Sequence, residues 1–288
     1  MDRIATEVQR YRVPDGIDVV ADVGGDPSAP AVILLHGGGQ TRHSWRGAMR
    51  ELLHAGYHVI NLDARGHGDS DWAIDGEYAL DALGRDLHAV IDTLPSPPAL
   101  VGASMGGATA LYLLGNAGDE KLASALVMVD IVPRVGAQGA AKISEFMRAN
   151  PNGFATLEEA ADAVAAYNPH RPRPKDPSGL MKNLRLREDG RLHWHWDPAF
   201  VVRKRPVEPP QFADMLLDAA SRVHIPSLLV RGLQSDLVTE ESVAEFRQHL
   251  HGLEVFDVKE AGHMVAGDKN DAFNSGVIGF LKRHLPLA

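Results

Sequence analysis

The sequence predicts an α/β protein: a mostly parallel sheet covered by helices, with a helical segment inserted late in the chain. Three observations support this fold class. Short apolar runs alternate with helix-length segments as far as residue 130, a pattern typical of a parallel sheet covered on both faces. Residues 133 to about 215 lack such runs and are rich in proline and charge. The alternation then resumes at Ile225.

The elements follow in order along the chain. Two opening strands are expected at residues 8–13 and 17–23, joined by the turn Pro14-Asp15-Gly16. Further strands are expected at residues 31–35, 57–60, 99–101, 126–129, 226–232 and 253–258, and helices at 44–55, 80–94 and 105–116. We therefore divide the chain into a catalytic core, residues 1–132 and 216–288, and a helical cap insertion, residues 133–215.

A serine between two glycines is the most informative motif. Ser104 stands in Gly102-Ala103-Ser104-Met105-Gly106, after an apolar strand and before a helix-forming run. This context indicates a nucleophile elbow, a sharp turn in which Cβ atoms at 102 and 106 would clash. Ser104 would then project from the turn, and the Met105 amide would be available to a developing oxyanion.

A glycine-rich loop follows the strand at residues 31–35. Its sequence, His36-Gly37-Gly38-Gly39-Gln40, resembles the oxyanion loop of the α/β-hydrolase family. The resemblance implies that the Gly38 amide joins that of Met105 in an oxyanion hole, with Gly39 as the second candidate. A phosphate-binding loop is the rival interpretation, but no Gly-Lys-Ser/Thr sequence follows.

The same resemblance implies that an acid and then a histidine follow the serine. Asp236 lies in the loop after the strand at 226–232, and His263 follows the strand at 253–258. His263 would accept the serine proton, and Asp236 would orient the imidazole. Asp130 is the alternative acid because it also follows an apolar run and some relatives take the acid from that earlier strand; we otherwise expect it to be structural or to line a pocket.

A further signature, Asp63-Ala64-Arg65-Gly66-His67-Gly68-Asp69-Ser70, closely resembles a loop common in this family. There its role is mostly structural, so Asp63 and Arg65 are expected to pair and to hydrogen-bond backbone groups. The resemblance spans the chain apart from the insertion. It implies an α/β-hydrolase fold with an eight-stranded, mostly parallel sheet.

The insertion contains the alternating sequence His193-Trp194-His195-Trp196. Alternation suggests an extended piece with its Trp and His side chains on opposite faces. Core packing is the first interpretation, and substrate-pocket lining by Trp194 and Trp196, together with Gly39, is the second. No metal site is predicted because the histidines have no companion ligands at helical spacing.

Composition limits the possible partners. The 288 residues carry a formal net charge of −9, which argues against nucleic acid as a partner. The absence of cysteine excludes disulfides, thiolate metal sites and a cysteine nucleophile. Neither a signal peptide nor a membrane-spanning stretch is evident in the sequence. We expect a cytoplasmic protein that acts on a small-molecule substrate without a cofactor and without a membrane partner.

The motifs together predict a serine hydrolase that cleaves a carboxylic ester, thioester or lactone through an acyl-enzyme. A cofactor-free haloperoxidase, better described as a perhydrolase, and a C–C bond hydrolase remain alternatives because they share the serine triad. A non-enzymatic small-molecule receptor on the same scaffold is the alternative from another class, since fold alone does not decide function. The serine at the elbow disfavours epoxide hydrolases and haloalkane dehalogenases, which use aspartate there.

Overall fold

The computed structural model describes residues 5–167, 173–202, 209–259, 261–263 and 270–287. Its main sheet has eight strands in the order β1-β2-β4-β3-β5-β6-β9-β10. β1 and β2 pair antiparallel, as do β2 and β4, and all other neighbours are parallel. The predicted fold is confirmed. The strands are β1 (Thr6–Arg12), β2 (Asp18–Gly24), β3 (Ala31–Leu35), β4 (His58–Leu62), β5 (Ala99–Ala103), β6 (Ala125–Val129), β9 (Ser227–Gly232) and β10 (Glu254–Val258).

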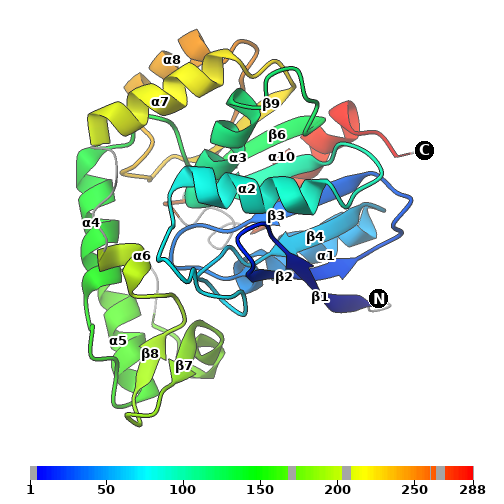
Figure 1. Ribbon diagram of the computed structural model, residues 1–288. Coiled ribbons are helices and arrows are strands. Elements are labelled where there is room, and N and C mark those ends of the chain that lie inside the picture. The colour runs from blue at the N-terminus through cyan, green and yellow to red at the C-terminus, as the bar shows by residue number, and fades with distance from the viewer. Residues whose placement is uncertain (1–4, 168–172, 203–208, 260, 264–269, 288) are drawn as a thin grey trace.

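Helices cover both faces of this sheet (Figure 1). One face packs against α2 (Leu80–Ile91), α3 (Met105–Gly115), α7 (Pro209–Ser221) and α8 (Glu240–His249). The other face packs against α1 (Arg46–His54), which follows the short helix η1 (Arg42–Trp45), and α10 (Asn270–His284). The central strands β3, β4 and β6 are buried throughout, as strands between two helical layers require. Among the described helices, none combines the length and apolarity needed to cross a bilayer.

The segment between β6 and α7 forms a lobe beside the sheet (Figure 1). It has its own apolar cluster, which includes Met147, Phe154, Trp194 and Trp196. The lobe includes two strands as well as helices, whereas the sequence predicted an extended piece only at residues 193–196, which the second strand, β8, overlaps. Asp189-Gly190 turns the chain between them, with Gly190 at a φ of +75°. Its elements are α4 (Ala137–Arg148), α5 (Leu157–Tyr167), η2 (Ser178–Asn183), β7 (Leu184–Leu186), β8 (Leu192–Trp194) and α6 (Ala199–Val202).

The predicted boundary between residues 215 and 216 falls inside α7. That helix packs against α3, and its residues Leu216, Leu217 and Ala220 are buried in the same cluster as the core helices. α7 therefore packs as part of the helical layer on the sheet. We call the segment from residue 133 to residue 208 the insertion.

The loop after β4 anchors the insertion to the sheet. Arg185 of β7 donates to an Asp69 carboxylate oxygen at 2.8 Å, and Tyr78 donates to Asp197 at 2.5 Å. The Asp197 amide also donates to the Gly66 carbonyl at 2.9 Å. These contacts connect β7 and the segment after β8 to the loop that follows β4.

The loop's two signature charges have different partners, contrary to the predicted pairing. Asp63 accepts hydrogen bonds from the Arg42 amide and guanidinium. Arg65 instead makes two bonds of 2.6 Å to Asp86 of α2. The Arg65 and Asp86 side chains are only 1% and 4% exposed. The loop is thus attached to two elements that flank the sheet.

We expect Asp86→Ala to lower the free energy of unfolding by about 3–5 kcal/mol, because it would leave the buried Arg65 charge with the partly exposed Asp15 as its charged partner and the Glu77 carbonyl as an acceptor. Asp81→Ala is the matched control on the same helix. It removes an exposed pair with Arg85 and should cost less than about 0.5 kcal/mol. Urea unfolding of both variants measures the difference, and equal losses would contradict this assignment.

Candidate active site

Ser104 lies at the turn between β5 and α3, as predicted. Its backbone has φ +45° and ψ −111°, a conformation that residues with a Cβ rarely adopt. The Ser104 amide donates to the Val129 carbonyl at 3.1 Å, and its carbonyl accepts from the Ala108 amide at 2.9 Å. The surrounding sheet and helix thus hold the strained turn in place, which is the arrangement that exposes a nucleophile.

The glycines beside Ser104 are required by close packing. A Cβ atom on Gly102 would lie 2.4 Å from the backbone of Gly106 and Gly107. A Cβ atom on Gly106 would lie 2.5 Å from the Leu35 carbonyl oxygen. The clash predicted at positions 102 and 106 is therefore confirmed, and it fixes the elbow against β3.

His263 contacts a buried carboxylate, that of Asp130. Asp130 directly follows β6, has φ +48° and is 0% exposed. Its Oδ2 atom accepts a hydrogen bond from His263 Nδ1 at 2.9 Å and another from the Ser235 hydroxyl. Its Oδ1 atom accepts from the Gly232 amide at 3.1 Å. Three donors therefore hold Asp130, and the His263 imidazole is one of them.

The structure joins His263 to Asp130 and not to Asp236, the acid that the sequence predicted as its partner. Asp236 is exposed, and its backbone carbonyl packs against Gly136 and Gly139 at the start of α4. Burial, and then the negative charge of Asp236, raise the pKa of the Tyr167 hydroxyl in α5 to about 12. In the loop after β9, Ser235 and not Asp236 therefore contacts the carboxylate that binds His263.

Ser104 and Asp130 directly follow two adjacent parallel strands, β5 and β6, and therefore lie at the same edge of the sheet. Ala103 and Val129, the residues before them, are partners in the parallel β5/β6 register. His263 follows β10, whose carboxyl end faces the same edge. Within the described residues, no hydrogen bond joins Ser104 Oγ to His263. Such contacts often tighten only when a substrate is bound.

The glycine-rich loop after β3 lies beside Ser104. A Cβ atom on Gly37 would be 3.4 Å from the Ser104 Cβ. The Gly37 amide donates to Gln40 Oε1 at 3.1 Å, and the Gly39 amide donates to His67 Nε2 at 3.1 Å. The Gly38 amide has no acceptor among the described residues. This difference favours Gly38 over Gly39 as the amide that would meet an oxyanion, together with the Met105 amide at the start of α3.

Apolar side chains of the insertion cover this loop. A Cβ atom on Gly38 would lie 3.5 Å from Phe200, and one on Gly39 would lie 3.1 Å from Met147 and 3.4 Å from Trp196. Trp196 therefore lies at the candidate site. Trp194 stacks on Trp196, with ring centroids 5.1 Å apart, and lies within the insertion's own cluster. Substrate binding by either Trp stays a prediction.

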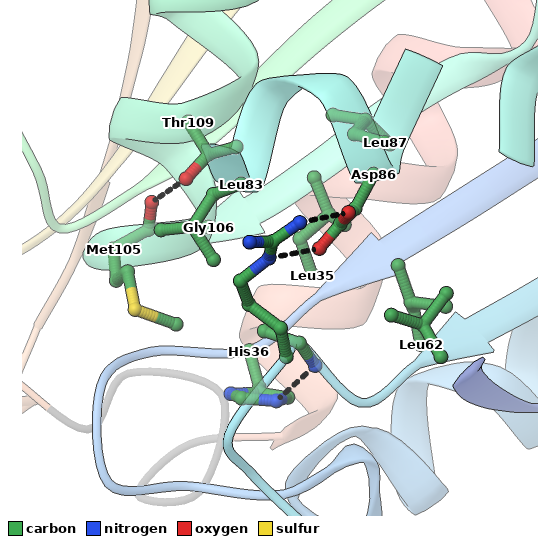
Figure 2. A pocket seen from close by; sticks show the side chains of 12 residues that line it. Leu35, His36, Leu62, Leu83, Asp86, Leu87, Met105, Gly106 and Thr109 are labelled. Atoms are coloured by element: carbon green, nitrogen blue, oxygen red, sulfur yellow. Dashed lines mark hydrogen bonds and ion pairs between the residues drawn. The ribbon is translucent and has the colours of Figure 1, made fainter. Parts of the chain in front are cut away.

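A small cavity lies on the inner side of the elbow (Figure 2). Its volume of about 20 Å³ is enough for about one water molecule and far too small for an acyl group. Figure 2 shows Asp86 among the lining side chains and Thr109 donating to the Met105 carbonyl. The cavity is lined by Val19, Leu35, His36, Leu62, Ala64, Arg65, Leu83, Asp86, Leu87, Met105, Gly106 and Thr109. This cavity therefore does not hold the acyl group of a substrate.

Side chains that could together hold a metal ion lie elsewhere in the described chain. His88 and Asp92, at the end of α2, and Glu120, in the loop after α3, bring their ligand atoms within 4.8 Å of one another. Two of the three are exposed acids, and such groups are common on protein surfaces. None of them belongs to the arrangement around Ser104.

Comparison with known proteins identifies the family of this chain. The α/β-hydrolase fold family matches residues 30–269. Esterase Rv0045c of Mycobacterium tuberculosis is 32% identical over 88% of this chain and 83% of its own. Its solved structure has a TM-score of 0.76 and covers 98% of this chain and 93% of that one.

Two further similarities extend the comparison. The sn-1-specific diacylglycerol lipase ABHD11 of Mus musculus is 27% identical over 89% of this chain and 82% of its own. The structure of E-2-(acetamidomethylene)succinate hydrolase has a TM-score of 0.83 at 21% identity, covers 96% of this chain and all of that one, and shows the shared fold. We conclude that this chain is a hydrolase of the α/β-hydrolase family.

Proposed function

We propose that this hydrolase cleaves carboxylic esters through an acyl-enzyme formed on Ser104. The observation that carries the proposal is the hydrogen bond of 2.9 Å between His263 Nδ1 and the buried Asp130, at the same sheet edge as the strained Ser104. The relatives support the substrate class, because they include an esterase, a diacylglycerol lipase and protein phosphatase methylesterases. Thioesters and lactones react through the same acyl chemistry.

The proposed reaction begins with attack of Ser104 Oγ on the acyl carbon while His263 Nε2 accepts the hydroxyl proton. Asp130 holds the Nδ1 proton, so the imidazole presents its unprotonated nitrogen and the resulting imidazolium is stabilised. The amides of Gly38 and Met105 donate to the oxyanion. His263 then protonates the leaving alkoxide. A water molecule, activated by the same nitrogen, releases the acid and restores Ser104.

The side chains beside Gly38 and Gly39 favour an apolar acyl group. Phe200, Met147 and Trp196 present only carbon and sulfur atoms to this loop at the distances given above. Burial of methylene groups against such side chains contributes about 0.8 kcal/mol each. The specificity constant should therefore rise with acyl length until the space under the insertion is filled.

Hydrolysis of p-nitrophenyl esters from acetate to decanoate tests the proposal. We expect kcat/KM to rise about three- to fourfold per methylene, as that burial energy implies, and then to fall. A fluorophosphonate should label the peptide that contains Ser104 and abolish turnover. Lack of turnover with every ester, together with failure of the fluorophosphonate to label Ser104, would refute the proposed function.

A further inference from the structure

The backbone groups of residues 37–40 are held by a set of partly buried hydrogen bonds. The Gln40 amide donates to the Gly37 carbonyl at 3.1 Å, and Gln40 Oε1 accepts from the Gly37 amide. The peptide groups of Gly39 are held instead by two histidines. Its amide donates to His67 Nε2, and its carbonyl faces His195 Nε2 at 3.3 Å. The loop's shape at Gly39, where φ is +74°, thus depends on side chains from outside the loop.

His67 can hold the Gly39 amide in only one tautomer. Its Nε2 accepts from that amide at 3.1 Å, so its proton is on Nδ1, which lies 3.1 Å from the Arg65 carbonyl. The side chain is fully buried, and burial together with the neighbouring His36 and His195 lowers its pKa well below the usual value. His67 is therefore a neutral acceptor at neutral pH.

His195 has the opposite tautomer and comes from the insertion. Its Nδ1 accepts from the Gly68 amide at 2.8 Å, so its Nε2 carries the proton and donates to the Gly39 carbonyl. Burial lowers its pKa to about 3. The ring of His195 lies 5.7 Å from that of His67, centroid to centroid. Each ring thus bridges the loop after β3 and the loop after β4.

We propose that His67 and His195 are positioning residues that orient the Gly39 peptide groups and so direct the neighbouring Gly38 amide toward the oxyanion. This inference rests on the proposed function. Because His195 belongs to the insertion, docking of the insertion and formation of the oxyanion hole are coupled. The insertion therefore supports the catalytic machinery in addition to covering it.

A role in packing alone makes a different prediction. Both rings also fill space, and His67 meets the edge of Phe200 with centroids 4.7 Å apart. If shape were all that mattered, phenylalanine at either position would preserve activity. If hydrogen bonds matter, the Phe variants should lose turnover and Gln variants should recover it, because Gln places an acceptor or a donor where the imidazole Nε2 stands.

The test compares ester hydrolysis by wild type, His195→Phe and His195→Gln. We expect His195→Phe to lower kcat about 30-fold with KM changed less than threefold, because a misplaced oxyanion donor acts on the transition state. His195→Gln should recover activity to within about threefold of wild type. The same pair of substitutions at His67 should behave in the same way.

His193→Phe is the matched control. His193 lies two residues before His195, but its Nε2 contacts the Asp189 carboxylate at 2.7 Å and not Gly39, so its replacement should leave kcat unchanged. Full activity of His195→Phe in an enzyme whose Ser104→Ala variant is inactive would overturn the positioning role alone. Inactivity of the wild type toward all esters would instead count against the proposed function.

A spectroscopic measurement tests the arrangement independently of turnover and of variant stability. Imidazole ¹⁵N spectra of the wild type at pH 7 should show His67 protonated on Nδ1 and His195 protonated on Nε2, both neutral. His67→Gln and His195→Gln assign the two signals. A charged His67, or a reversed tautomer at either position, would overturn the inference because Gly39 could not then be held from both sides.

Discussion

Replacement of Asp130 with asparagine is expected to lower kcat by about 10³- to 10⁴-fold. The Gly232 amide must still find an acceptor at position 130, since it donates to Oδ1 in the structure. Asparagine would therefore keep its oxygen toward Gly232 and turn its NH₂ group toward His263. That group donates to Nδ1, forces the proton of the imidazole onto Nε2 and removes the base.

Asp236→Asn is the matched control, and it decides between the two acids that the sequence offers. The carboxylate is exposed and contacts neither His263 nor Ser104, so we expect kcat within about twofold of wild type, as for most exposed substitutions. Steady-state rates with one p-nitrophenyl ester, beside melting curves that verify folding, measure both variants. A large loss in Asp236→Asn with activity retained in Asp130→Asn would restore the original assignment.

The fold was predictable because its signals are local. Apolar runs such as residues 31–35 and 126–129 became buried parallel strands, and alternation with helices fixes how such strands are covered. The hairpin of β7 and β8 was missed because each strand has only three residues. Its local signals were the alternation at residues 193–196 and the Asp189-Gly190 pair, which is typical of a tight turn between strands.

The choice of acid was not predictable in the same way. Asp130 and Asp236 both follow buried strands, and the local sequence does not say which carboxylate turns inward. The answer depends on the positive φ at Asp130 and on the Gly232 amide, a contact across 102 residues. His195 was considered only for packing or metal binding for the same reason, since its partner Gly68 lies 127 residues away.

Ser104→Gly is expected to abolish turnover and at the same time to stabilise the fold. Loss of the nucleophile should lower kcat by at least about 10⁴-fold. The backbone at Ser104, with φ +45° and ψ −111°, costs a residue that has a Cβ about 1–3 kcal/mol, and glycine avoids that strain. Glycine also loses about 0.5–1 kcal/mol through the greater freedom of the unfolded chain. The net gain should be about 1 kcal/mol, or a Tm higher by about 2–4 °C.

Ser104→Ala separates the two effects. It removes the hydroxyl but keeps the Cβ, so it should be as inactive as Ser104→Gly while melting close to the wild type. The glycines at 102 and 106 already leave no room for the turn to relax, because Cβ atoms there would lie 2.4–2.5 Å from neighbouring backbone atoms. The strain must therefore remain at position 104 as long as that residue has a side chain. Equal Tm values for the Gly and Ala variants would show that the turn costs the fold little, and the elbow would then be held without opposing strain.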